Sequence, residues 1–204
     1  MEKLGRPEPR LQTPTPAQQL FSSGNTVAFD VLRRATDDFA RTRLIGKGGS
    51  CAVYSGDIDM ALIKSASKGK GTGKGKGPEK QAVKRCAIKV LKTGGDATDK
   101  PSVWAQTQFA MEINVLTRVK HPNLVELYAY SIDGEHKCLV LERMEGSLHD
   151  RLLDMNKPPL GWQQRVHIIL PVCRALVHLH SLEPKPLIHR DVKVGHLILP
   201  CCLY

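Results

Sequence analysis

Short segments spread along this 204-residue chain carry residues whose types and spacing could do chemistry. Gly46-Lys47-Gly48-Gly49 lies between two strand-like runs, and glycines let backbone N–H groups approach a phosphate without an intervening side chain. Taken alone, this run is weak evidence for a phosphate site and fits a glycine-rich hairpin without a ligand better. Lys89 lies inside the apolar run CAIKVL, so we expect its ammonium to have a partner or a ligand unless it faces outward. Glu112, on the next predicted helix, is a carboxylate that could pair with it.

The elements that position these residues are predicted from hydrophobic periodicity. Apolar residues at helical spacing within residues 27–39 predict a short amphipathic helix, in which Thr36 caps a further turn. The stretch RLIGKGGSCAVYSG predicts two antiparallel strands joined by a glycine-rich turn, and CAIKVL predicts a third strand. A helix with Trp104, Phe109, Ile113, Leu116 and Val119 on one face should end near His121-Pro122.

The second half of the chain begins with a predicted hairpin. The runs LVELYAYSI and KCLVLERM are separated by the turn Asp133-Gly134. Residues 161–180 return to a helical pattern, in which Pro171 lacks an N–H and should cause a kink or a late start. Strands first and helices later, without βαβ alternation, predict an α+β protein: an antiparallel lobe followed by the start of a helical lobe.

Composition and charge limit the classes of protein. The net charge is +10, and the segment from Lys64 to Arg85 holds eight basic residues against the single acid Glu79. Its core, KGKGTGKGKG, predicts a solvated loop, and without interleaved aromatic residues it does not predict a specific nucleic-acid site. The six cysteines form no CxxC pair, and neither a signal peptide nor an apolar stretch of membrane-spanning length occurs. We therefore expect a cytoplasmic protein with no membrane span.

The segment Ile188-His189-Arg190-Asp191-Val192-Lys193 follows directly on the helix that ends in LVHLH. A glycine-rich loop, an AIK lysine, a helix glutamate and an HRD loop, in this order, resemble the protein kinase superfamily. FDVLRRATDDF, HPNLVEL, GSLHDRL and LGWQQRVHII are similar to the Pelle, interleukin-receptor-associated and plant receptor-like serine/threonine kinases. A chance HRD sequence is the alternative, against which the three preceding matches argue. The resemblance covers roughly residues 29–199.

The resemblance implies a protein-kinase-like fold. We expect an antiparallel-sheet N-lobe with one main helix, plus the first helices of an incomplete helical C-lobe. Residues 1–26, rich in proline, would form a flexible leader, and 27–204 a partial kinase domain. Within it, the N-lobe would span 40–143 with a Lys/Gly-rich insertion at about 62–84. The start of the C-lobe would span 144–199 and an atypical tail 200–204.

The resemblance also implies which residues bind the cofactor ATP. Gly46 and Gly48 match the glycines over the phosphates, and Val53 matches the valine that covers adenine. Lys89 matches the lysine that holds the α- and β-phosphates, and Glu112 matches its ion-pair partner.

The hinge and catalytic residues follow in the same way. Leu141 stands at the gatekeeper position, and the backbone groups of Glu142 and Met144 match the hinge that hydrogen-bonds adenine. Asp191 matches the catalytic base, and Lys193 matches the lysine typical of serine/threonine kinases.

Three departures from the family pattern concern the phosphate loop and the metal. Ser50 and Cys51 replace the loop aromatic and the third glycine, and His196 stands where a magnesium-binding asparagine is expected. None of the 13 residues after Asp191 is Asp or Glu. Imidazole is a poor ligand for Mg²⁺, so we assign no metal ligand although the family uses Mg²⁺.

We therefore expect a serine/threonine kinase domain that binds ATP and acts on a protein substrate or meets a signalling adaptor. The alternative is a non-catalytic truncated or pseudokinase module that competes for the partners of a full-length kinase. A binder of acidic partners working through the Lys/Gly loop ranks last. Self-association is expected through an exposed C-terminal apolar surface that includes Ile169, Cys173, Leu176, Leu179 and Leu197.

Overall fold

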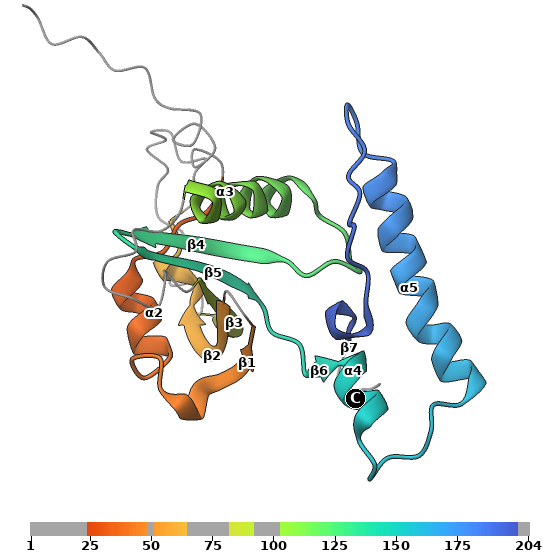
Figure 1. Cartoon of the computed structure of the whole chain (residues 1–204). Coiled ribbons are helices and arrows are strands. Elements are labelled where there is room, and N and C mark those ends of the chain that lie inside the picture. The colour runs from red at the N-terminus through yellow and green to blue at the C-terminus, as the bar shows by residue number, and fades with distance from the viewer. Residues whose placement is uncertain (1–23, 49–50, 65–81, 92–102, 200–204) are drawn as a thin grey trace, which may run out of the picture.

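The computed structural model describes residues 24–48, 51–64, 82–91 and 103–199 (Figure 1). Most of the expected leader, the loop KGKGTGKGKG that is expected to be solvated, and the tail 200–204 lie outside these residues. The first part is a five-stranded sheet in the order β1-β2-β3-β5-β4, with every neighbouring pair antiparallel. The expected N-lobe architecture is therefore confirmed. Its strands are β1 (Leu44–Lys47), β2 (Cys51–Asp59), β3 (Val83–Leu91), β4 (Leu127–Asp133) and β5 (His136–Glu142).

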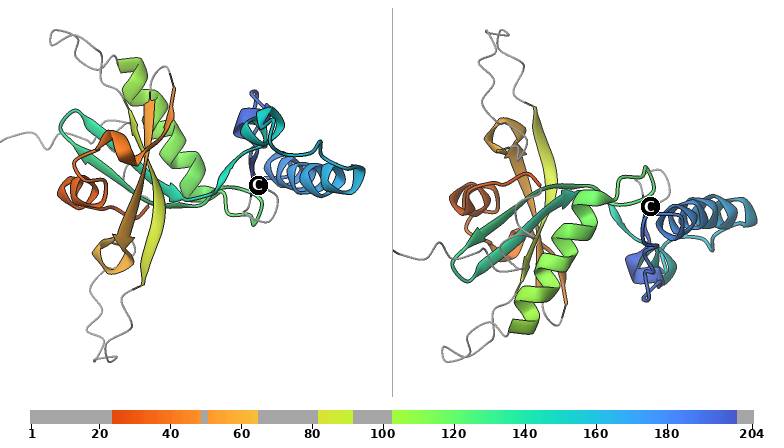
Figure 2. Two further views of the ribbon diagram at one scale, coloured as in Figure 1. Left: turned by 90° about the horizontal axis from the view of Figure 1, so that it is seen from below. Right: turned by 90° about the horizontal axis from the view of Figure 1, so that it is seen from above.

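Each face of the sheet has its own apolar core, because alternate residues of a strand point to opposite faces. On one face, helix α2 (Phe29–Ala35) buries Leu32 against a cluster that includes Ile58 and Ile88. On the other, helix α3 (Val103–Arg118) buries Phe109 and Ile113 against β4 and β5. Figure 2 shows the two helices on opposite sides of the sheet. The helix that carries Glu112 therefore lies on the face of Lys89.

The segment after α2 is a tight turn that holds this helix on the sheet. Thr36 is fully buried, and its hydroxyl donates to the Leu32 carbonyl at 2.7 Å. Thr36 thus ends α2, and its hydroxyl also accepts from the Phe39 N–H at 3.1 Å, so it caps the following turn as expected. Asp37, Asp38 and Phe39 follow with φ of 52°, 55° and 56°, a left-handed conformation that costs energy in each non-glycine residue.

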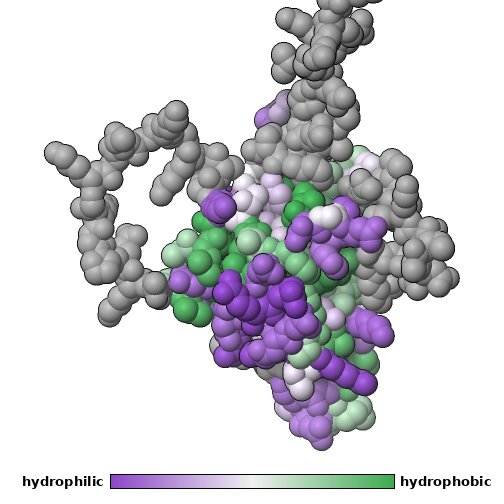
Figure 3. Space-filling view, turned by 90° about the vertical axis from the view of Figure 1, so that its left-hand side faces the viewer, coloured by the Kyte–Doolittle hydropathy of each residue, from purple (hydrophilic) through white to green (hydrophobic). Residues whose placement is uncertain are grey.

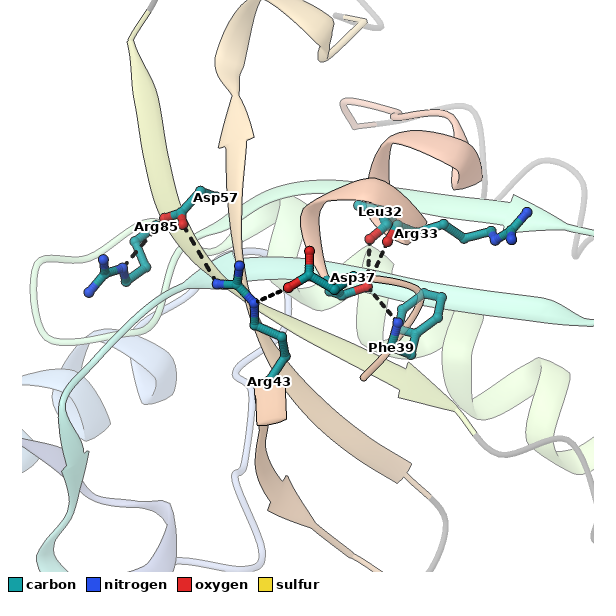
Figure 4. A network of polar contacts seen from close by, with 8 residues as sticks. Leu32, Arg33, Asp37, Phe39, Arg43, Asp57 and Arg85 are labelled. Carbon is teal, nitrogen blue, oxygen red and sulfur yellow. Dashed lines mark hydrogen bonds and ion pairs between the residues drawn. The ribbon is translucent and has the colours of Figure 1, made fainter. Parts of the chain in front are cut away.

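Ion pairs join this turn to the strands (Figure 4). Arg43, in the short 3-10 helix Arg41–Arg43, donates to Asp37 at 2.7 Å and lies 3.9 Å from Asp57 on β2. Arg85 on β3 reaches the same Asp57 at 3.4 Å. Figure 3, seen from the side of α2, shows hydrophilic side chains gathered at the centre of this face. Pairs this exposed contribute little energy individually, so the apolar core around Leu32 is what chiefly holds α2 on the sheet.

Residues at the edges of the expected insertion and leader are part of the fold. Thr26 forms isolated bridges to both Lys64 and Tyr130, so the lobe begins before the expected boundary at residue 27. The short 3-10 helix Met60–Leu62 follows β2, and Lys84 lies in β3 with its ammonium 4.7 Å from the centre of the Tyr128 ring. The insertion is therefore narrower than the expected 62–84.

The second part consists of helices and a two-stranded pair. Strand β6 (Gly146–Ser147) leads into α4 (Leu148–Leu153), which a Ser147–Asp150 capping box begins. Helix α5 (Trp162–His180) runs through Pro171, so of the two expected effects of this proline, a kink or a late start, the late start is excluded. The chain then passes the 3-10 helix Val194–His196 to β7 (Ile198–Leu199), which pairs antiparallel with β6. Leu148, Leu160, Ile168 and Leu199 form the core of this part.

One face of α5 packs inward and the other remains exposed. Ile168, Ala175 and Leu179 are buried, so Leu179 is not part of the exposed apolar surface, contrary to the expectation. Ile169 and Val177 are 59% and 65% exposed, and Trp162 and Cys173 are also exposed. A helix that is apolar around most of its circumference normally has partners on all sides. No helix in the described ranges has the length and apolar character needed to cross a bilayer.

Candidate functional site

Lys89 and Glu112 form the ion pair that the sequence predicts. Lys89 lies on β3 directly opposite Val53 of β2 and Leu139 of β5. Its Nζ donates to Glu112 Oε1 at 2.6 Å, and the two side chains remain 25% and 34% exposed. The Lys89 ammonium thus projects from an apolar strand, forms an ion pair with the Glu112 carboxylate and remains partly accessible to water. An anionic ligand could therefore share this ammonium.

The glycine turn between β1 and β2 lies next to this pair along the sheet. Gly46 is opposite Val53, as the predicted strand–turn–strand requires. The Gly48 N–H donates to the Cys51 carbonyl at 2.9 Å, so in this conformation it closes the turn and is not free to donate to a phosphate. Gly49 and Ser50 lie outside the described residues.

The hinge candidates connect the two parts of the molecule. The Glu142 N–H donates to the Glu126 carbonyl at 2.9 Å, which keeps the end of β5 in the sheet. Met144 is half-buried, and within the described ranges its N–H has no acceptor. Leu141 packs on the core that contains Phe109. The hinge therefore offers a backbone donor to a ligand.

The Asp191 segment is organised by its own neighbours. Lys193 Nζ donates to Asp191 Oδ2 at 2.9 Å, and His196 Nδ1 donates to the Asp191 carbonyl at 2.9 Å. The hydrogen bond from Lys193 lowers the pKa of Asp191, with smaller contributions from the charges of Lys193, His196 and His189. The carboxylate is exposed and ionised at neutral pH. It can accept a proton or orient a hydroxyl that approaches from solvent.

Backbone pairing ties this segment to the hinge. Strand β7 pairs with β6, which directly follows the hinge, and the Leu148 N–H donates to the Leu197 carbonyl at 2.7 Å. A second contact between the two parts is made by side chains: the rings of His121, after α3, and His178, on α5, stack with centres 4.9 Å apart. The structure thus assembles Lys89, Glu112 and Val53 in the first part and Asp191 and Lys193 in the second, with the hinge between them.

Two candidate residues were missed by reasoning from the sequence. Ile45, directly before Gly46, and Ile198, on β7 beside the hinge-flanking β6, are apolar strand residues with exposed side chains. The sequence signal was available only for Ile45, which directly precedes Gly46 in a predicted strand, because Ile198 lies on a two-residue strand without a local pattern. Exposed apolar groups there offer contact area to a flat ring.

The described residues do not form a magnesium site. Within them, no group of three or more His, Cys, Asp or Glu side chains could hold a metal ion. His196 lies beside Asp191 and contributes nitrogen, whereas Mg²⁺ prefers hard oxygen ligands. His196 therefore does not supply the oxygen ligand that Mg²⁺ prefers.

Comparisons with known proteins all find protein kinases. Residues 67–200 match the family described as protein kinase domain. The Pelle-like serine/threonine-protein kinase pik-1 of Caenorhabditis elegans is 36% identical over 175 residues, which cover 85% of this chain and 32% of that protein. The receptor-like kinase TMK4 of Arabidopsis thaliana is 34% identical over 178 residues, covering 85% and 16%. This chain thus spans less than half the length of these relatives.

Solved structures show the same fold. The apo GRMZM2G135359 pseudokinase superposes with a TM-score of 0.66 at 19% identity, covering 99% of this chain and 60% of that one. The pseudokinase domain of BIR2, an immune regulator of the RLK/Pelle family, superposes with a TM-score of 0.57 at 23% identity, covering 92% and 54%.

Proposed function

Because this chain belongs to the protein kinase family and its relatives include Pelle-like and plant receptor-like kinases, we propose that it binds ATP at the Lys89–Glu112 pair. We further propose that it transfers the γ-phosphoryl group to Ser or Thr hydroxyls of a protein. The observation that carries the proposal is the 2.6 Å ion pair, whose ammonium remains partly exposed. A cation held by a single carboxylate on an otherwise apolar strand face suits a phosphate ligand.

The proposed roles in nucleotide binding follow from these positions. Lys89 contacts the α- and β-phosphates, and Glu112 keeps its ammonium on the ligand side of the strand. Gly46 and Gly48 lie beside the phosphates, where Gly48 donates only if its hydrogen bond to Cys51 opens. Val53 covers the base from the sheet.

The hinge is proposed to recognise adenine. Its backbone groups at Glu142 and Met144 hydrogen-bond the base, and the free Met144 N–H supports this role. Ile45 and Ile198 contribute apolar contact from strands on either side of the hinge.

Asp191 is proposed as the base for the substrate hydroxyl. The hydroxyl oxygen forms a bond to the γ-phosphorus, the bond to the β–γ bridging oxygen breaks, and the hydroxyl proton passes to Asp191. A carboxylate of lowered pKa is a weak base, so Asp191 orients the hydroxyl and accepts its proton late in the transfer. Lys193, hydrogen-bonded to Asp191, holds that carboxylate and adds positive charge near the transferred group.

A second candidate function, a binding module without turnover, is favoured by His196. This imidazole replaces an oxygen ligand beside Asp191 and hydrogen-bonds the Asp191 backbone instead. In this class of reaction catalysis consists of positioning and charge neutralisation, so loss of a metal ligand removes transition-state stabilisation. Such a module would hold nucleotide or a protein partner without phosphorylating it.

Equilibrium binding of a fluorescent ATP analogue, with and without Mg²⁺, tests the proposal on the 204-residue chain. Lys89→Met should weaken binding about 10- to 100-fold, the value of a charge-assisted contact. Lys84→Met on the same strand, whose ammonium contacts Tyr128 on the opposite face, should bind like the wild type. Wild-type protein that does not bind, or equal binding by Lys89→Met, would overturn the proposal.

Radiolabelled phosphoryl transfer to a generic protein substrate separates the two candidates. If the chain is an active kinase, Asp191→Asn abolishes phosphoryl transfer and retains nucleotide binding. Binding without any transfer by the wild type selects the second candidate.

The exposed face of α5 supports self-association as a further part of the proposal. Ile169 and Val177 lie eight positions apart, at helical spacing, so they present a continuous apolar stripe. Sedimentation velocity should show concentration-dependent association that Ile169→Glu reduces. A wild-type protein that stays monomeric across the accessible concentration range would refute self-association through α5.

A further inference from the structure

A cavity of about 610 Å³ lies at the C-terminal end of α3, where this helix meets the start of β4, and neither Lys89 nor Asp191 lines it. Its walls are the C-terminal end of α3 with the loop that follows, the start of β4, and the first described residues of the chain. Half-buried apolar side chains line it, among them Leu116, Val119, Leu124 and Leu127. The volume lies within the range of pockets that hold a ligand or a pair of side chains. Glu142, at the end of β5 and part of the proposed hinge, also lines it, whereas no other residue with a proposed kinase role does.

Gly24 and Asn25 form one wall of this cavity and are rigidly placed. Asn25 accepts from the Tyr130 N–H at 3.0 Å and donates from its side chain to the Tyr128 carbonyl at 3.1 Å. Gly24 has φ of 121°, and a Cβ there would lie 2.7 Å from Thr117 Cγ2. The chain therefore enters the fold against α3 in a conformation that only glycine adopts easily. The residues just before Gly24 must start at the cavity.

We propose that Leu20 and Phe21 of the same chain occupy this cavity. Phe21 is three residues from Gly24, so their Cα atoms are at most about 11 Å apart. Leu20-Phe21 is also the only pair of adjacent large apolar residues in 1–23, and two serines separate it from Gly24. A tether this short gives these side chains a high effective concentration at the apolar lining.

Occupation would connect the C-terminal end of α3 to strand β4 of the sheet. The cavity spans Leu116 to Lys120 on the helix side and Glu126 to Tyr128 on β4, so one inserted aromatic side chain contacts both elements. Glu112 lies one turn before Leu116 on the same helix. The N-terminal segment would thereby hold the helix that supplies the carboxylate for Lys89. This inference rests on the cavity and the chain path and is independent of the proposed nucleotide binding.

Site-specific photo-crosslinking in the full 204-residue chain tests the proposal. A benzophenone amino acid replaces Phe21 in one variant and Ser22 in another, and mass spectrometry identifies the crosslinked peptides. Position 22 lies nearer to Gly24, so tethering alone would give it an equal or higher yield. Insertion instead predicts that position 21 crosslinks intramolecularly to residues 116–128 with a yield several-fold above that of position 22.

A second variant checks that the cavity itself is the target. Val119→Glu places a charge in the lining and should reduce the crosslink from position 21 several-fold, while circular dichroism shows that the fold is retained. Equal yields at positions 21 and 22, crosslinks to peptides elsewhere, crosslinks only between two molecules, or no effect of Val119→Glu in a folded protein would each overturn the proposal.

Discussion

Gly56→Ala tests whether α2 packs on the sheet as closely as the structure shows. Gly56 is buried on β2, and an added Cβ would lie 2.7 Å from Ile88 Cδ1 and 2.9 Å from the Ala35 carbonyl oxygen. Both distances are shorter than any normal carbon contact. Ile88 can shift its terminal methyl group, but the Ala35 carbonyl is backbone at the end of α2 and can move only with the helix.

The expected loss follows from these two contacts. Overpacking by one methyl group costs typically about 1–3 kcal/mol, against which alanine gains about 0.4–1 kcal/mol by restricting the unfolded chain. A net loss of about 1–2 kcal/mol should lower the melting temperature of a 204-residue chain by about 2–8 °C. The free energy of unfolding should fall by the same amount in urea, without a change of slope.

Two variants make the measurement specific. Gly195→Ala has no atom within 4 Å of its added Cβ and no left-handed backbone, so it should be neutral or slightly stabilising. Ile88→Val removes the nearer clash and should partly rescue Gly56→Ala in a double-mutant cycle, whereas the Ala35 clash persists. If Gly56→Ala unfolds no more easily than Gly195→Ala, α2 does not approach β2 as described.

Two further predictions concern ionisable groups. Lys193→Ala should raise the pKa of Asp191, because the substitution removes the hydrogen bond that chiefly lowers this pKa. An NMR titration of the Asp191 carboxyl carbon that shows no rise in pKa would contradict the prediction. In the wild type the lowered pKa means that the contribution of Asp191 to stability is present at neutral pH and is lost as the pH falls through the folded-state pKa. Burial raises the pKa of Cys86 to about 11 and that of Cys138 to about 12. Iodoacetamide at pH 8 should therefore alkylate the exposed Cys173 first and reach Cys86 and Cys138 only on unfolding. Mass-spectrometric mapping that finds all three cysteines equally labelled in native protein would refute the burial of Cys86 and Cys138.

Local pattern predicted most of the first lobe. Alternation placed Lys89 on a strand, helical spacing placed Glu112 on the next helix, and both lie on the same face of the sheet as expected. The hairpin of β4 and β5 turns at Gly134, whose φ of 55° explains the signal of Asp133-Gly134. Strong periodicity over several residues is what made these elements predictable.

The turn after α2 and the strands β6 and β7 were not predictable, because contacts between residues far apart in the sequence determine them. Thr36 followed by two aspartates has the sequence of a helix start, yet it ends α2. The reason is that Phe39 packs near Phe29 and Tyr54 and so compensates for three left-handed residues in a row. Strands β6 and β7 are two residues long and carry no local pattern. They exist because backbone groups far apart in the sequence meet.

The path of Asn25 to Val27 has a consequence for how copies of this chain behave in solution. Strand β4 is the outermost strand of the sheet, and an open edge of N–H and C=O groups invites another molecule to add a strand. Here the Val27 N–H donates to the Tyr130 carbonyl and the Tyr130 N–H donates to the Asn25 carbonyl, so the entering chain already occupies part of that edge. Residues 25–27 therefore protect this edge of the sheet against strand addition by another molecule. Removing them would leave the backbone groups of Tyr130 open to pairing with a second copy of the chain.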